Sequence, residues 1–171
     1  RAFVWEAEHQ SAFEEARRVL SSVPVMAHFD PDKPVVVVTD ASRLKGLGFA
    51  LLQEVDGHNR IVTCNSRSLT SAEGNYATVE LELLAVAWAC RHCKLYLVGL
   101  PHFQVVSDHR PLKGIVNKSL DAQENPRLLR LLEKLRPFQF DLEWVAGKSH
   151  LIADALSRAP VSEPDGEEDD V

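Results

Sequence analysis

The chain has 171 residues, of which 45% are hydrophobic and 26% charged, so it is long enough for one domain with a substantial core. No segment approaches the roughly 20 apolar residues of a membrane-spanning helix and no signal-peptide pattern is present, so we expect an intracellular protein without a membrane partner. The formal charge of −6 does not exclude a nucleic-acid partner, because six acids after Val161 account for it.

Strands and helices alternate in the predicted secondary structure. In chain order, we expect a helix over 6–20, strands over 34–40, 47–53 and 60–65, a helix from the capping-box pattern at 70–73 to about Leu97, a strand over 103–107, helices over 111–116 and 126–135, a strand over 138–145 and a helix over 151–157. The first strand contains four consecutive valines, which is typical of a buried central strand. A meander followed by crossover strands predicts an α/β domain with a five-stranded mixed sheet flanked by helices.

Two of the three cysteines, Cys90 and Cys93, have the CxxC spacing of some zinc sites. Zinc needs about four ligands, and the sequence contains no second pair. Both residues lie in the predicted long helix, so we interpret them as small apolar core residues in a reducing environment.

Four acids interrupt apolar sequence. Asp40 and Asp108 end predicted strands, Glu82 lies in the long helix, and Asp154 lies in the last helix. Each of them alone has an ordinary interpretation as a helix cap or a strand end, and Asp108 before Pro111 is one such candidate cap. If the first and fourth strands are parallel neighbours, however, Asp40 and Asp108 emerge at the same edge of the sheet, where a helix crossing beneath can add Glu82.

Carboxylates that converge repel one another unless a multivalent cation binds between them. Oxygen ligands without His or Cys favour Mg²⁺ or Mn²⁺, and two such ions serve phosphoryl transfer. Glu80 competes with Glu82 for the helical position. Because residues two apart on a helix point about 200° apart, only one of them can join the site, and spacing alone does not choose between them.

Five motifs together carry a family resemblance: TDAS (39–42), NSRSL (65–69), NYATVELELLAVAWA (75–89), VSDHRPLK (106–113) and GKSHLIADALSR (147–158). In order and spacing they resemble the ribonuclease H domain of gypsy-type retrotransposon reverse transcriptases, over about residues 3–159. The resemblance implies a ribonuclease H-like fold, and a nuclease that cleaves the RNA strand of an RNA/DNA hybrid with two Mg²⁺ ions, for which Mn²⁺ can substitute. It places the four catalytic and metal-ligating acids at Asp40, Glu82, Asp108 and Asp154, and so selects Glu82 over Glu80.

The sequence departs from the family in two places. Some relatives carry a basic helix and loop that grips the hybrid, for which residues 117–125 are too short, so we expect the polymerase part of the parent polyprotein to help to hold substrate. Some relatives also have a mobile His about ten residues before the last Asp. The nearest candidate here is His150, four residues before Asp154, and its alternative interpretation is a surface His near a turn.

Candidate substrate contacts are less distinctive. Arg127 and Arg130 lie with Lys134 on one helical face, which is either a phosphate-binding stripe or an ordinary solvated face interrupted by Glu133. Arg67 and Tyr76 lie in family motifs and are further candidates for contacts with the hybrid.

From the resemblance we expect residues 1–27 to be the tail of the link to the polymerase part, 28–159 the ribonuclease H domain, and 160–171 a disordered acidic tail. Localisation should be cytoplasmic, in virus-like particles. The alternatives are a catalytically silent module of the same fold, and a nuclease or integrase of that fold that acts on DNA.

Overall fold

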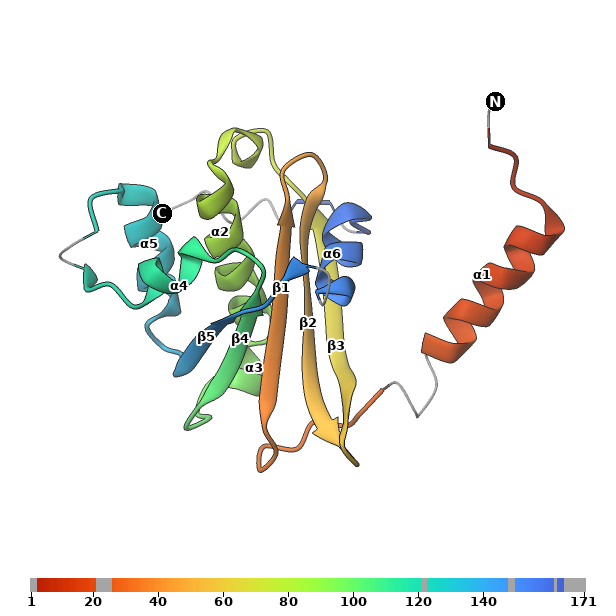
Figure 1. The fold of residues 1–171 in the computed structure, drawn as a ribbon, viewed down its shortest axis with the longest axis horizontal. Coiled ribbons are helices and arrows are strands. Elements are labelled where there is room, and N and C mark those ends of the chain that lie inside the picture. The colour runs from red at the N-terminus through yellow and green to blue at the C-terminus, as the bar shows by residue number, and fades with distance from the viewer. Residues whose placement is uncertain (1–2, 21–25, 121–122, 148–149, 162, 165–171) are drawn as a thin grey trace.

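The computed structural model describes residues 3–20, 26–120, 123–147, 150–161 and 163–164 (Figure 1). Most of the expected acidic tail therefore lies outside the described residues. The elements are α1 (Ala7–Leu20), β1 (Val35–Ser42), β2 (Gly46–Val55), β3 (His58–Ser68), the 3₁₀ turn η1 (Glu73–Asn75), α2 (Thr78–His92), α3 (Lys94–Leu97), β4 (Phe103–Ser107), α4 (Pro111–Val116), α5 (Pro126–Leu135), β5 (Phe140–Trp144) and α6 (Leu151–Arg158).

The five strands form one mixed sheet in the order β3-β2-β1-β4-β5, which confirms the predicted fold class. β1, β2 and β3 are an antiparallel meander, and its second turn places Asp56 and Gly57 at positive φ, as a tight hairpin requires. β4 pairs in parallel with β1 on one side and with β5 on the other. The carboxyl ends of β1, β4 and β5 therefore lie at the same edge of the sheet.

Helices cover both faces of the sheet. On β1, Val35 and Val37 pack into the main core with α2, whereas Val36 and Val38 line a hollow beside α6 on the opposite face. α5 packs against α2, so α2 lies between the sheet and the outer helix (Figure 1). Cys90 and Cys93 are free and buried, and burial raises the pKa of Cys93 to about 12, so both serve as small core residues as predicted.

The structure differs most from the predicted secondary structure in the long helix expected from residue 70 to about Leu97. The reciprocal hydrogen bonds between Thr70 and Glu73 form, but they close the short turn η1 rather than the start of the helix. α2 begins later, at Thr78, where the Glu80 carboxylate accepts a hydrogen bond from the Ala77 amide at 2.8 Å. Cys93 then separates α2 from α3.

α1 lies apart from the sheet and its helices (Figure 1). Several large apolar side chains of this N-terminal segment are exposed, including Phe3, Trp5 and Phe13. Among the described residues, no helix combines the length and the apolar character that are required to cross a bilayer.

Candidate metal centre

Three carboxylates converge at the carboxyl edge of the sheet. Asp40 comes from β1, Asp108 follows β4, and Glu82 reaches the same point from α2. Their oxygen atoms lie within 4.8 Å of one another. Asp40 and Glu82 are 6% and 4% exposed, so two of the three charges are almost fully removed from water. The parallel pairing of β1 and β4 brings the two Asp residues together, as the sequence pattern predicts.

The electrostatics of this cluster are unfavourable without a cation. Burial, and then repulsion from Asp40 and Asp108, raises the pKa of Glu82 from its ordinary value of 4.5 to about 9. Burial also raises the pKa of Asp40. A hydrogen bond from Ser157 opposes this shift, and the charges of Asp108 and Asp154 add to it. Within the described residues Oε2 of Glu82 is buried and accepts no hydrogen bond. A hard divalent cation binds clustered carboxylate oxygens, and a buried carboxylate oxygen that accepts no hydrogen bond is free to be one of its ligands.

The fourth acid, Asp154, lies beside this cluster on α6 rather than within the group of three. Arg158, one helical turn later, binds its carboxylate with N···O distances of 2.7 and 2.5 Å. The Ser157 hydroxyl donates a short hydrogen bond to Asp40, which ties α6 to the end of β1. α6 also approaches β2 closely, because a Cβ atom at Gly48 would lie 2.5 Å from the Ser157 amide nitrogen. Asp154 is therefore held near the cluster by packing and by two polar contacts.

The structure contradicts the interpretation of His150 as an ordinary surface residue near a turn. The residue is only 4% exposed, and its Nε2 lies 2.7 Å from the carbonyl oxygen of Thr39. This contact joins the start of α6 to the residue before Asp40. His150 thus lies where it can position β1 against α6, and its burial does not resemble that of a mobile surface side chain.

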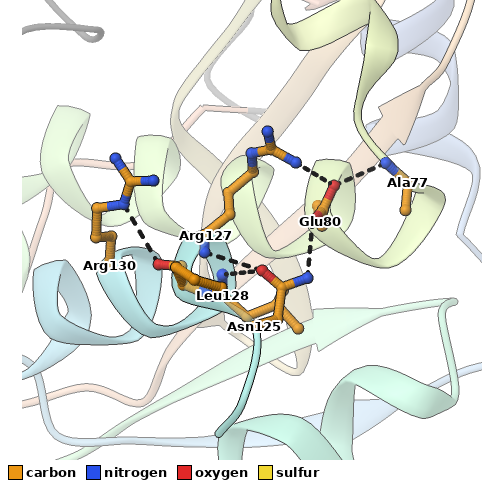
Figure 2. Close-up of polar contacts among 7 residues, drawn as sticks. Ala77, Glu80, Asn125, Arg127, Leu128 and Arg130 are labelled. Atoms are coloured by element: carbon orange, nitrogen blue, oxygen red, sulfur yellow. Dashed lines mark hydrogen bonds and ion pairs between the residues drawn. The ribbon is translucent and has the colours of Figure 1, made fainter.

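Glu80 and Glu82 have opposite surroundings, as their angular separation on α2 requires. The Glu80 carboxylate accepts hydrogen bonds from the Asn125 amide at 2.9 Å and from Arg127 at 2.8 Å (Figure 2). Burial alone would raise the pKa of Glu80, but these bonds and the one from the Ala77 amide outweigh it and hold the pKa below its ordinary value. Glu80 therefore joins α2 to α5, and Glu82 is the helical residue that reaches the cluster.

The predicted substrate contacts separate into buried and exposed residues. Arg67 is 1% exposed and forms two hydrogen bonds with Glu73, of 2.8 and 2.7 Å, so its guanidinium offers no surface to a nucleic acid. This placement indicates a structural role for Arg67, since arginine is seldom fully buried unless it is paired. The guanidinium of Arg127 lies 3.9 Å from the centre of the Tyr76 ring. Arg130 is exposed on the same helix, α5, as Arg127 (Figure 2).

Several residues around the centre have no signal in the sequence strong enough to single them out. Ser107 interacts with the Glu82 carboxylate and opposes the rise in its pKa, and the Ser157 hydroxyl donates a hydrogen bond to Asp40. The Trp144 indole donates a hydrogen bond of 2.9 Å to the carbonyl oxygen of Asp108. Trp144 ends a strand of alternating pattern, which is a partial signal for an outward-facing aromatic.

Comparisons with known proteins agree with this geometry. Residues 30–138 match the family described as the RNase H-like domain found in reverse transcriptase, a range that contains Asp40, Glu82 and Asp108 and ends before Asp154. The retrovirus-related Pol polyprotein from transposon 412 of Drosophila melanogaster is 35% identical over 161 residues, which are 94% of this chain. The chain spans only 13% of the length of that polyprotein.

Solved structures share the fold. The dRH form of a foamy viral protease-reverse transcriptase, in complex with double-stranded DNA, has a TM-score of 0.61 at 19% identity, covering 83% of this chain and 26% of that chain. A foamy viral protease-reverse transcriptase in complex with an RNA/DNA hybrid has a TM-score of 0.54 at 19% identity, covering 98% of this chain and 22% of that one. RNase H1 from the archaeon Halobacterium salinarum has a TM-score of 0.51 at 22% identity, covering 72% of this chain and 93% of that chain.

Proposed function

The chain belongs to the family of RNase H-like domains found in reverse transcriptases, and its relatives are retrotransposon Pol polyproteins; from this premise we propose that it is an endoribonuclease. It hydrolyses the RNA strand of RNA/DNA hybrids during reverse transcription of its element. The observation that carries the proposal is the convergence of Asp40, Glu82 and Asp108 to within 4.8 Å in a largely buried position.

Asp40, Glu82, Asp108 and Asp154 would hold two Mg²⁺ ions, with Mn²⁺ as a substitute. Bound there, the ions would supply an activated water and stabilise the leaving oxygen of the phosphodiester. The chain's own residues orient the ligands. Ser157 fixes one oxygen of Asp40, and Arg158 fixes the Asp154 carboxylate. The contact of His150 with the Thr39 carbonyl holds the elements that carry these two acids in register.

Substrate binding is assigned to the surface near the start of α2 and α5. Tyr76 and Arg127 present an aromatic ring and a guanidinium there. Arg130 adds an exposed charge one turn further along α5 (Figure 2). Cations bind phosphates with little regard for sequence, as a nuclease of this kind requires. The complex of the foamy viral relative with an RNA/DNA hybrid supports the same class of substrate for this chain.

The polyprotein relatives support different roles for three segments of the chain. We assign residues 1–27 to the link with the polymerase part, 28–159 to the nuclease domain and 160–171 to an acidic tail. The exposed apolar side chains of α1 fit a helix whose partner lies elsewhere in such a polyprotein. We also propose that the domain acts in the cytoplasm, within virus-like particles, and its retrotransposon relatives support this localisation.

A cleavage assay tests the proposal. The chain is incubated with an RNA/DNA hybrid labelled on the RNA strand, with Mg²⁺ or Mn²⁺, with EDTA, and beside single-stranded and duplex DNA. Asp40→Asn should abolish cleavage while leaving the fold intact, and Asp141→Asn, an exposed acid on β5, should cleave as the unmodified chain does. Cleavage that persists in Asp40→Asn or in EDTA would contradict the proposal. A folded chain that cuts nothing would identify a silent module, and a preference for DNA would identify a different nuclease.

A further inference from the structure

We propose that Arg110 and Trp144 form a binding site for the sugar–phosphate backbone of the nucleic acid, directly beside the carboxylate cluster. The inference rests on the proposed function, since it concerns how that substrate is held. It assigns a role to two residues outside the predicted catalytic and substrate-binding sets.

The fold fixes Trp144 next to the cluster. β4 and β5 are parallel, with Ser107 opposite Trp144, so both strands end at the edge of the sheet where the acids gather. The Val145 amide donates to the Ser107 carbonyl at 3.1 Å, and the indole of Trp144 donates to the Asp108 carbonyl at 2.9 Å. The aromatic ring is thus attached to the same residue that supplies one of the three clustered carboxylates.

Trp144 is nevertheless 43% exposed, so part of its ring is open to a ligand. The guanidinium of Arg110 lies 6.0 Å from the centre of the ring. Arg110 is exposed and lies two residues after Asp108, at the start of α4. A cation and an exposed aromatic surface therefore share one patch at the rim of the centre.

The charge distribution makes this cation distinctive. The phosphates that flank the scissile one lie away from the proposed metal ions, so positive charge at the rim of the centre would help to bind them. Arg158 is bound to Asp154 at 2.5 Å, and Arg127, which is also assigned to substrate binding, shares its guanidinium with Glu80 at 2.8 Å. Within the described part of the chain Arg110 is paired with no carboxylate, which leaves its guanidinium available to a phosphate.

The pair has the chemistry of a backbone site. A guanidinium donates two parallel hydrogen bonds to a phosphate, and an indole offers a flat apolar face to a sugar or a base. Both contacts are independent of sequence, which suits an enzyme that must act along a whole hybrid. The competing explanation is that Trp144 acts only through its hydrogen bond to Asp108, as a clamp on the loop after β4.

Binding measurements separate the two explanations. A fluorescently labelled RNA/DNA hybrid is titrated with the full chain in the Asp40→Asn background, with Mg²⁺ present, over a series of salt concentrations. The variants are Arg110→Ala, Trp144→Ala and Trp144→Phe, and the last keeps an aromatic face but loses the indole donor. The matched control is Arg136→Ala, an exposed arginine just after α5, at the opposite edge of the sheet.

We expect Arg110→Ala and Trp144→Ala each to raise Kd about tenfold. Arg110→Ala should also reduce the slope of log K against log salt by about one, and Trp144→Ala should leave that slope unchanged. The Kd of Trp144→Phe should stay within about threefold of the parental Kd. The Kd of the control, Arg136→Ala, should equal the parental Kd.

Two outcomes would overturn the inference: Arg110→Ala that binds with the parental affinity and salt slope, or Trp144→Phe that binds as weakly as Trp144→Ala. The Arg110 result does not depend on whether the Trp144 variants fold. Cleavage by the unmodified chain, measured in parallel, reports on the proposed nuclease independently. If the unmodified chain cleaves the hybrid but the Arg110 and Trp144 variants bind it as tightly as their parent, the backbone site is refuted and the proposed nuclease is not.

Discussion

Replacing Glu82 with glutamine should remove a pH dependence that the carboxylate cluster imposes on the stability of the metal-free protein. The folded state raises the pKa of Glu82 from 4.5 to about 9, so between these values the folded protein holds a proton that the unfolded chain has released. The stability that this proton maintains is fully present below about 4.5 and is lost as the pH rises towards about 9. The metal-free chain should therefore become less stable as the solution becomes more alkaline.

The magnitude follows from the size of the shift. A change from 4.5 to about 9 corresponds to about 6 kcal/mol at about 1.4 kcal/mol per pH unit. This value is an upper limit on the contribution of Glu82. If unfolding releases one full proton from Glu82, raising the pH from about 6.5 to about 8.5 lowers the free energy of unfolding by about 3 kcal/mol. Glutamine has the shape of the protonated acid and carries no titratable group, so the variant should be nearly flat over this range.

Urea denaturation in EDTA at several pH values measures both slopes. Glu133→Gln, a substitution of an exposed glutamate on α5, serves as the control and should follow the unmodified chain. Adding Mg²⁺ should stabilise the unmodified chain at alkaline pH more than it stabilises Glu82→Gln, because a ligand stabilises only the state that binds it. Parallel pH profiles for Glu82→Gln and the unmodified chain would refute the electrostatic account of the cluster.

Three further substitutions test how the centre is supported. Arg67→Ala should lower the free energy of unfolding by about 3–5 kcal/mol, because it leaves the buried Glu73 carboxylate without its charged partner, and Arg67→Met combined with Glu73→Leu should recover most of the loss in urea denaturation. Gly48→Ala should cost about 1–3 kcal/mol and weaken Mg²⁺ binding in calorimetry, because the new methyl group pushes α6 away from β2, and unchanged affinity would separate α6 from the metal centre. His150→Ala should cost about 1–3 kcal/mol in thermal unfolding through loss of the contact with the Thr39 carbonyl, and an unaltered melting temperature would contradict this role.

The sequence predicts the parts of the structure that depend on local pattern. β4, α4 and α5 have the predicted bounds, since Pro111 and Pro126 each start a helix and the strand is a short apolar run. The meeting of Asp40 with Asp108 follows from the same level of reasoning, because parallel neighbouring strands end at one edge.

Contacts between side chains far apart in the chain cannot be predicted from local sequence patterns. The capping pattern at Thr70 and Glu73 forms, yet it closes η1, because the same Glu73 carboxylate also binds the buried Arg67. No local rule identifies that partner or predicts that an arginine will be buried. The burial of His150 likewise depends on a contact with Thr39, which lies 111 residues earlier in the chain.

The tether from Ser157 to Asp40 joins residues near the two ends of the described domain. They are separated by 117 positions, so the first carboxylate of the cluster is oriented by the last helix. A chain cut within α6 would keep the five strands of the sheet but lose the group that orients Asp40, so its affinity for Mg²⁺ should fall.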